Sequence, residues 1–154
     1  MSNIRRPAVA GMFYPGGAAA LQAMVDEFMA QTPQPAGAAP KAVIVPHAGL
    51  VYSGPVAATA YAQLAPARDE IRRIVLLGPS HRLPFQGLAL SSAERFSTPL
   101  GEITLDREAM ALLDDLPGRL DGIDVVYEAT AGALRRGIPG RMRGVVDHIV
   151  ESAG

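Results

Sequence analysis

Two short apolar runs, each followed by a histidine, constrain this chain more than any other feature. His47 follows Ala42-Val43-Ile44-Val45-Pro46, and His81 follows Ile74-Val75-Leu76-Leu77-Gly78-Pro79-Ser80. Both runs are rich in aliphatic and β-branched residues and are closed by Pro or Gly, a pattern that predicts buried strands. The stretch between the histidines has about the length of one βαβ unit, roughly 30 residues. We therefore expect two neighbouring parallel strands with a helix between them.

The carboxyl ends of parallel strands meet at one edge of a sheet, where α/β proteins bind their ligands. Neighbouring strands lie ~4.8 Å apart, so His47 and His81 would come close enough to share one ion. Imidazole is a common ligand of iron, zinc, copper and nickel. The pattern predicts a metal site with His47 and His81 as ligands; the alternative is that each histidine bonds backbone groups at its own strand end.

A third metal ligand is less clearly indicated. Four residues qualify by type alone: Glu94, Asp106, Glu128 and His148. Each is also suited to a solvated surface position, and Asp106 is suited to cap a helix. A site with only two ligands would hold its metal weakly.

Other polar side chains near the histidines are candidates for substrate contacts. Tyr52 suits an acid or a substrate-positioning group, with packing as its alternative role. Arg82 and Ser80 follow the Gly78 turn, where a cation and a hydroxyl suit a substrate carboxylate; a surface position is the alternative for Arg82. A serine nucleophile is not expected, because the Gly-x-Ser-x-Gly turn is absent. Neither a Walker nor a dinucleotide-binding motif is present.

The remaining pattern completes an α/β domain. We expect a helix from about Gly17 to Gln31 and a second from Pro55 to about Leu64, with Ser53 or Gly54 as its cap. Further expectations are an extended segment over 6–15, a loop over 32–40, a strand over 87–91, a hairpin over 96–105, a helix over 106–113, a strand over 121–127 and a helix over 143–151. This order predicts a three-layer αβα arrangement with a mostly parallel sheet.

Composition narrows the class of protein. The 154 residues suffice for one domain with a substantial core. A net charge of -1 argues against nucleic acid or an anionic membrane as partner. The absence of cysteine excludes disulfides and thiolate ligands, and it fits a reducing cytoplasm. Neither a signal peptide nor an apolar run of the ~20 residues needed for a membrane span is present, so we expect a cytoplasmic protein.

Three segments together closely resemble one family. They are Arg6-Pro7-Ala8-Val9-Ala10-Gly11-Met12-Phe13-Tyr14-Pro15, then Val45-Pro46-His47-Ala48-Gly49-Leu50-Val51-Tyr52-Ser53-Gly54-Pro55-Val56-Ala57, and Leu76-Leu77-Gly78-Pro79-Ser80-His81-Arg82. The chain resembles the Memo family, whose prokaryotic members are often called AmmeMemoRadiSam system protein B. The segments Gly87-Leu88-Ala89-Leu90-Ser91 and Phe96-Ser97-Thr98-Pro99-Leu100-Gly101 also look like that family. The resemblance covers residues 4 to about 127.

The resemblance implies a LigB-like fold, similar to the class III extradiol ring-cleaving dioxygenases, in which two histidines and a carboxylate hold Fe(II). His47 and His81 match the two histidine positions. In the Memo family a later Cys or His completes the site, and iron or copper with redox activity is the usual association. The partner would be an unknown small molecule or peptide, with a radical-SAM protein of the same system as a further candidate.

The chain departs from the family after its first 128 residues. Family members continue with an Asp/Glu-His-Ser-Leu-Glu-Val-like motif and a later Ser-Asp-x-x-His-like motif, and neither occurs here. We therefore divide the chain into a Memo-like part, 1–128, incomplete at its C-terminus, and an atypical tail, 129–154, rich in Arg, Gly and Ala. Two alternatives to a metal enzyme follow: a binding module without catalysis, and a truncated product with little activity.

Resequencing the gene across codons 120 to 160 tests the origin of this tail. Gly132-Ala133-Leu134-Arg135-Arg136-Gly137-Ile138 can be back-translated so that a one-base shift reads Glu-His-Ser-Val-Glu-Val, close to the family motif. We expect a single-base correction to restore the family motifs. A verified stop with no motif in any frame would contradict a frameshift.

Overall fold

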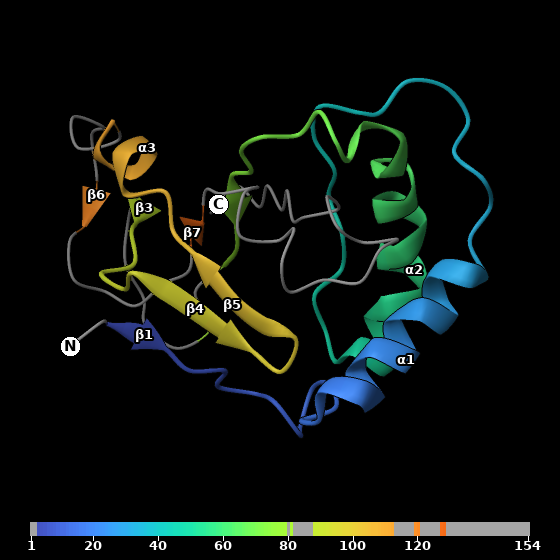
Figure 1. Cartoon of the computed structure of the whole chain (residues 1–154), viewed down its shortest axis with the longest axis horizontal. Coiled ribbons are helices and arrows are strands. Elements are labelled where there is room, and N and C mark those ends of the chain that lie inside the picture. The colour runs from blue at the N-terminus through green and yellow to red at the C-terminus, as the bar shows by residue number, and fades with distance from the viewer. Residues whose placement is uncertain (1–2, 80, 82–87, 113–118, 121–126, 129–154) are drawn as a thin grey trace.

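The computed structural model describes residues 3–79, 81, 88–112, 119–120 and 127–128. These residues form a mixed α/β structure with a three-stranded sheet at one end and a pair of helices at the other (Figure 1). In chain order the elements are β1 (Ile4–Arg5), α1 (Ala18–Ala30), α2 (Leu50–Ala62), the 3-10 turn η1 (Ala65–Ala67), β2 (Leu76–Leu77), β3 (Leu88–Ala89), β4 (Arg95–Thr98), β5 (Gly101–Thr104), α3 (Arg107–Ala111), β6 (Arg119–Leu120) and β7 (Tyr127–Glu128).

The described strands pair in both parallel and antiparallel orientations. In the sheet ordered β1-β4-β5, β1 is parallel to β4 and β4 is antiparallel to β5. The two-residue strands form two further pairs, β3 parallel to β6 and β2 antiparallel to β7. The α/β class expected from the sequence is confirmed, while the described pairs are divided between parallel and antiparallel.

The hairpin expected over 96–105 is confirmed as β4 and β5. Its turn is stabilised by the Thr98 hydroxyl, which donates to the Gly101 carbonyl at 3.0 Å and accepts from the Leu100 backbone N–H at 3.1 Å. Gly101 takes a φ of 135°, a value that side chains other than hydrogen rarely allow. One face of the hairpin joins α3 in an apolar core that comprises Ala93, Phe96, Leu105 and Met110.

Helix α1 matches its expected range, but α2 begins earlier than expected. Gly49, not Ser53 or Gly54, precedes its first turn, and Pro55 lies inside the helix. The early start is explained by the Phe13 carbonyl, which accepts from the Leu50 backbone N–H at 2.6 Å. That bond satisfies one of the amide groups that a helix N-terminus leaves without a partner.

The N-terminal segment 6–15 is not extended throughout, as its prolines suggested. The chain turns at Gly11, which has a φ of 80°. Its N–H donates to the Tyr14 carbonyl at 2.8 Å, and Ala10 and Tyr14 form an isolated bridge. Glycine adopts this left-handed conformation without the steric cost that other residues meet. The turn places Phe13 beside the start of α2.

The run before His47 is extended, yet the expectation of a buried strand was wrong. Residues 42–46 belong to no strand in the described structure. Val43 and Val45 are buried against Ala57 and Leu64, whereas Ile44 is 72% exposed. This alternation is typical of an extended segment with one covered face. The run before His81 alternates in the same way, with Ile74 buried and Val75 42% exposed, but there the expected strand is confirmed over the two residues of β2.

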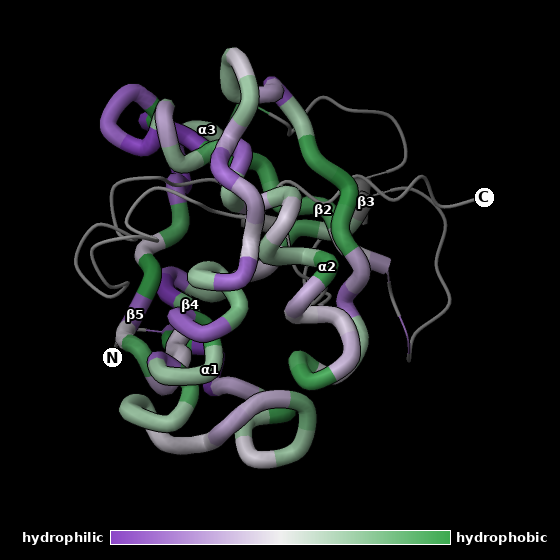
Figure 2. The backbone as a smooth tube through the Cα atoms, turned by 90° about the vertical axis from the view of Figure 1, so that its right-hand side faces the viewer, coloured by the Kyte–Doolittle hydropathy of each residue, from purple (hydrophilic) through white to green (hydrophobic). Residues whose placement is uncertain are grey.

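The hydropathy of the chain follows this packing. In Figure 2 the tube at β2 is green, the colour of apolar residues. None of the helices that the structure describes has both the length and the apolar composition needed to cross a bilayer.

Several expectations are met in part or fall on undescribed residues. The strand over 87–91 is confirmed as β3, and the loop over 32–40 contains no helix or strand. Of the strand over 121–127, only Tyr127 is described, in β7. The helix over 143–151 lies outside the described residues, as does the whole of the tail. Strand β6 was not anticipated.

The contact between α1 and α2 supplies a test of the fold. A Cβ added at Gly54 would lie 2.6 Å from Cδ2 of Phe28. Overpacking costs about 1–3 kcal/mol, and alanine in a helix recovers about 1 kcal/mol relative to glycine. We expect Gly54→Ala to lower the free energy of unfolding by about 1 kcal/mol in urea titrations. A Phe28→Leu background, which shortens the opposing ring, should reduce that loss; an equal loss in both backgrounds would contradict the contact.

Candidate functional site

His47 is positioned by the packing of the extended run on α2. Val43 and Val45 contact the helix, so the chain leaves this core in a defined direction just before Pro46 and His47. After the histidine, the Ala48 carbonyl accepts from the Ser53 hydroxyl at 2.9 Å. This bond links the residue that follows His47 to the first turn of α2. The backbone is therefore held on both sides of the imidazole.

His81 follows β2 from a different part of the fold. Ile74 lies in the interior with 4% of its surface exposed, and Leu76 pairs with Glu128 of β7. Gly78 and Pro79 then lead the chain out of the strand. Like His47, His81 is exposed to solvent, so both rings are accessible from outside the protein.

The structure brings the two histidines together. The Nε2 atoms of His47 and His81 lie 3.1 Å apart, with ring centroids 5.2 Å apart and planes inclined by 44°. Their meeting was expected, but the reason for it differs. The expectation was a shared ladder of parallel strands, whereas the described run before His47 forms no ladder and is held by packing on α2.

Two physical arrangements suit this geometry. If one imidazole carries its proton on Nε2, that N–H donates to the other Nε2 across the 3.1 Å separation. If both Nε2 atoms are deprotonated, they can bind one ion. For ligand bonds of about 2.1 Å, a 3.1 Å separation corresponds to an angle of about 95° at the ion. That angle lies close to the octahedral value of about 90° and below the tetrahedral value of about 109°.

Within the described ranges, no group of three His, Asp or Glu side chains could hold a metal. Glu94, one of the four candidate third ligands, is exposed. Glu128 belongs to β7, although its side chain is not described, and His148 lies outside the described residues. The described residues therefore do not supply a complete set of three metal ligands.

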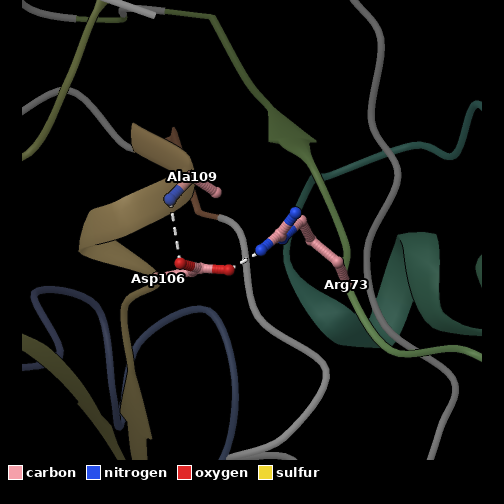
Figure 3. Close-up of polar contacts among 3 residues, drawn as sticks. All are labelled: Arg73, Asp106 and Ala109. Carbon is pink, nitrogen blue, oxygen red and sulfur yellow. Dashed lines mark hydrogen bonds and ion pairs between the residues drawn. The ribbon is translucent and has the colours of Figure 1, made fainter. Parts of the chain in front are cut away.

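Asp106, the fourth candidate, has another role. One of its oxygens accepts from the Ala109 backbone N–H at 2.9 Å, and the other accepts from Arg73 Nε at 2.7 Å (Figure 3). The bond from Ala109, followed by the contacts with Arg73, holds the pKa of this carboxyl below its usual value. Asp106 is the N-cap of α3, as its position before a helix suggested.

Tyr52 and Ser53 lie on the first turn of α2, next to the histidine loop. Tyr52 is 81% exposed, and its Cδ2 would be 3.6 Å from a Cβ at Gly49. The ring is therefore available to a molecule at the site. Ser53 is buried and its hydroxyl is engaged with backbone carbonyls, which argues against its being a nucleophile. Ser80 and Arg82, the candidate substrate contacts, lie outside the described residues.

Two exposed side chains near the site were not anticipated. Met12 and Phe13 are 71% and 51% exposed, in the turn whose backbone bonds the start of α2. The signal in the sequence was Gly11, a residue that permits a tight turn inside an otherwise extended segment.

Comparison with known proteins matches most of the described chain. A family profile described as "Memo-like protein" matches residues 5–128. "Protein MEMO1" of Danio rerio is 40% identical over 114 residues, which cover 72% of this chain and 37% of that protein. "Protein MEMO1" of Homo sapiens is 39% identical over 114 residues, covering 70% and 36%. "MEMO1 family protein" of Aquifex aeolicus is 37% identical over 107 residues, covering 69% and 38%. The chain thus spans little more than a third of the length of these curated relatives.

The Asp106 cap leads to a prediction about stability and pH. Removing an N-cap side chain costs about 1 kcal/mol, so Asp106→Ala should lower the free energy of unfolding by about that amount at pH 7. Because the folded pKa is depressed below 3.8, the contribution is present above that value and is lost as pH falls through the folded pKa. Urea titrations at pH 7 and near pH 2.5 measure this difference.

Asp69→Ala provides the control, because the Asp69 side chain is 85% exposed and its ion pair with Arg68, at 3.5 Å, lies at the surface. It should change stability little at either pH. Equal effects of the two substitutions would show that the cap at Asp106 contributes nothing of its own.

Proposed function

This chain belongs to the Memo family, and from that membership we propose that it is a metal-binding, oxidoreductase-like protein whose iron or copper ion is held by His47 and His81. The substrate is an unspecified small molecule or peptide. The single observation that carries the proposal is the 3.1 Å separation of the two Nε2 atoms, reached by residues from different parts of the fold.

The donor set fits either metal. Imidazole nitrogen is an accepted ligand of both iron and copper, and two histidines with one carboxylate form the open site of many non-haem Fe(II) enzymes. When bound, such an ion would supply Lewis acidity and one-electron redox chemistry. The exposure of both histidines supports the proposal, since a substrate could reach the ion from solvent.

The backbone around the histidines would contribute orientation. The Ser53 bond to Ala48 and the packing of Val45 restrict the approach to His47 on both sides. A ligand held on a restricted backbone loses less entropy when it binds an ion, so these contacts would favour binding. We also propose that the chain has the LigB-like three-layer fold that its resemblance to the Memo family implies.

The other predicted site residues have defined roles in this proposal. Tyr52 would position the substrate or donate a proton, because its exposed ring lies beside the histidine loop. Arg82 and Ser80 would bind an anionic group of the substrate. Glu128 and His148 are the remaining candidates for the third ligand, since Asp106 is engaged in its cap and with Arg73.

A second candidate function is a binding module for a peptide. Several apolar side chains of the Gly11 turn and of α2 are more than half exposed: Met12, Phe13, Val51, Tyr52 and Val56. Exposed apolar groups gathered in one region favour a protein or peptide ligand. In this alternative the histidines would contribute to the surface without holding a metal.

Metal content tests the first function. The purified chain, loaded anaerobically with Fe(II) or with Cu(II) and desalted, should hold up to one ion per chain by elemental analysis. We expect His47→Ala and His81→Ala each to reduce that content at least tenfold, because a single imidazole remains. EDTA should strip the metal from the unmodified chain.

Asp106→Ala is the control, since its carboxylate is engaged in the cap of α3 and with Arg73. It should retain the metal content of the parent. Unchanged metal content in both His47→Ala and His81→Ala would overturn the proposal. Retention of the parent's circular dichroism spectrum by each variant excludes unfolding as the cause of a loss.

The peptide alternative has a separate test. Peptides selected from a display library for binding to the chain should bind at least fivefold more weakly to Tyr52→Ala and Phe13→Ala. Binding should be unaffected by His47→Ala if the surface acts without a metal. Peptides whose affinity depends on His47 and not on Tyr52 would contradict the module and support the metal site.

A further inference from the structure

A second candidate site lies at the three-stranded sheet. A cavity of about 270 Å³ opens where β1 ends and the chain continues through Pro7 to Val9. Residues of β4, β5 and β2 complete its wall. Neither histidine lines it. The volume is close to the lower end of the range found for small-molecule pockets, about 300–1,000 Å³.

The charged side chains of this cavity are both arginines. Arg5 and Arg6 line it, and the described residues of its wall include no aspartate or glutamate. Among the described residues Arg68, Arg73 and Arg95 each contact a carboxylate, whereas neither Arg5 nor Arg6 forms such an ion pair. The cavity therefore presents positive charge that the surrounding described chain does not neutralise.

One of these arginines is held in place by an aromatic ring. Parallel pairing places Arg5 opposite Phe96, and the Arg5 guanidinium carbon lies 5.1 Å from the centre of that ring. Such stacking restricts the guanidinium but leaves its N–H groups available at the edges. Arginine held in this way is suited to bind the two oxygens of a carboxylate or phosphate.

Hydroxyl groups add neutral donors to the wall. Tyr14 and Ser97 line the cavity, and burial raises the pKa of Tyr14. A tyrosine with a raised pKa keeps its proton at neutral pH and can donate it in a hydrogen bond. The Thr98 hydroxyl, also in the wall, is already engaged in the hairpin turn.

Much of the remaining wall is apolar. Leu76, Phe96 and Ile103 come from three different strands and meet at the cavity. A wholly inorganic anion would leave these side chains without a partner, whereas a compact apolar group would cover them. The combination of a cationic end and an apolar wall defines the chemical class of the ligand.

We propose that this cavity binds a small organic anion, in which a carboxylate or phosphate group meets Arg5 and Arg6 and a compact apolar group contacts Leu76, Phe96 and Ile103. The proposal does not rest on the metal site, because the described residues that line this cavity include neither a histidine nor a candidate third ligand. Leu76 connects it to β2, the strand that precedes His81.

Calorimetric titration of the full chain with benzoate and, separately, with phenyl phosphate tests the proposal at constant ionic strength. We expect saturable one-to-one binding of at least one of the two, and the stronger binder identifies the anionic group. Inorganic phosphate should bind at least tenfold more weakly than phenyl phosphate, because it has no apolar group. Absence of saturable binding by both organic anions would overturn the proposal.

Substitutions locate the binding within the chain. Arg6→Gln should weaken binding at least tenfold, and Arg6→Lys by a smaller factor, because lysine keeps the charge and loses the bidentate geometry. Arg95→Gln is the matched control: it removes the same charge from β4, outside the cavity, and should change affinity less than twofold. Arg5→Gln tests the guanidinium that stacks on Phe96. If this variant fails to fold, Arg6→Gln still tests the proposal, because the Arg6 side chain is exposed. Equal effects of Arg6→Gln and Arg95→Gln would overturn the proposal.

His47→Ala separates this site from the metal centre. It should leave the affinity for benzoate and phenyl phosphate unchanged while it lowers metal content. Loss of anion binding in His47→Ala, with Arg6→Gln still binding, would assign the anion to the histidine site and contradict a separate cavity.

Discussion

The packing of Val43 and Val45 on α2 is the contact on which the candidate site depends. These two side chains lie on the covered face of an extended run and join Ala57 and Leu64 in one apolar core. Burial of an aliphatic side chain of this size stabilises a protein by roughly 1.5–3 kcal/mol. Because the run has no ladder partner in the described structure, this packing is what determines where the following histidine lies.

A second set of contacts, at the start of α2, also holds the loop that carries His47. The Phe13 carbonyl accepts from Leu50, and the Ser53 hydroxyl donates to Ala48. Gly54 permits α2 to approach the Phe28 ring of α1, where a side chain would overlap it. The histidine loop is therefore supported by the N-terminal turn and by the helix pair, although neither contributes a ligand. The anion cavity at β1 depends instead on the β1–β4 pairing, so the two proposed sites rest on separate parts of the core.

Several local features could be predicted because their physical causes are local. The helix expected from about Gly17 to Gln31 matches α1 within one residue at each end. Asp106 before a helical stretch indicated a cap, and its carboxylate does accept from Ala109. The start of α2 was misplaced, because the bond from Leu50 to Phe13 joins segments far apart in the sequence. The residues around Pro55 contain no pattern from which that hydrogen bond could be predicted.

The sequence by itself determined that His47 and His81 each follow an apolar extended run, and its motifs determined the family. Both follow from residue order, since periodicity and motif spacing are properties of the chain. Only the tertiary structure decided that the Nε2 atoms lie 3.1 Å apart and that packing on α2, not a parallel ladder, places His47. It also gathered Arg5, Arg6 and Tyr14 around one cavity. These outcomes depend on which segments, far apart in the sequence, pack against one another, and that packing is set by the hydrophobic core as a whole.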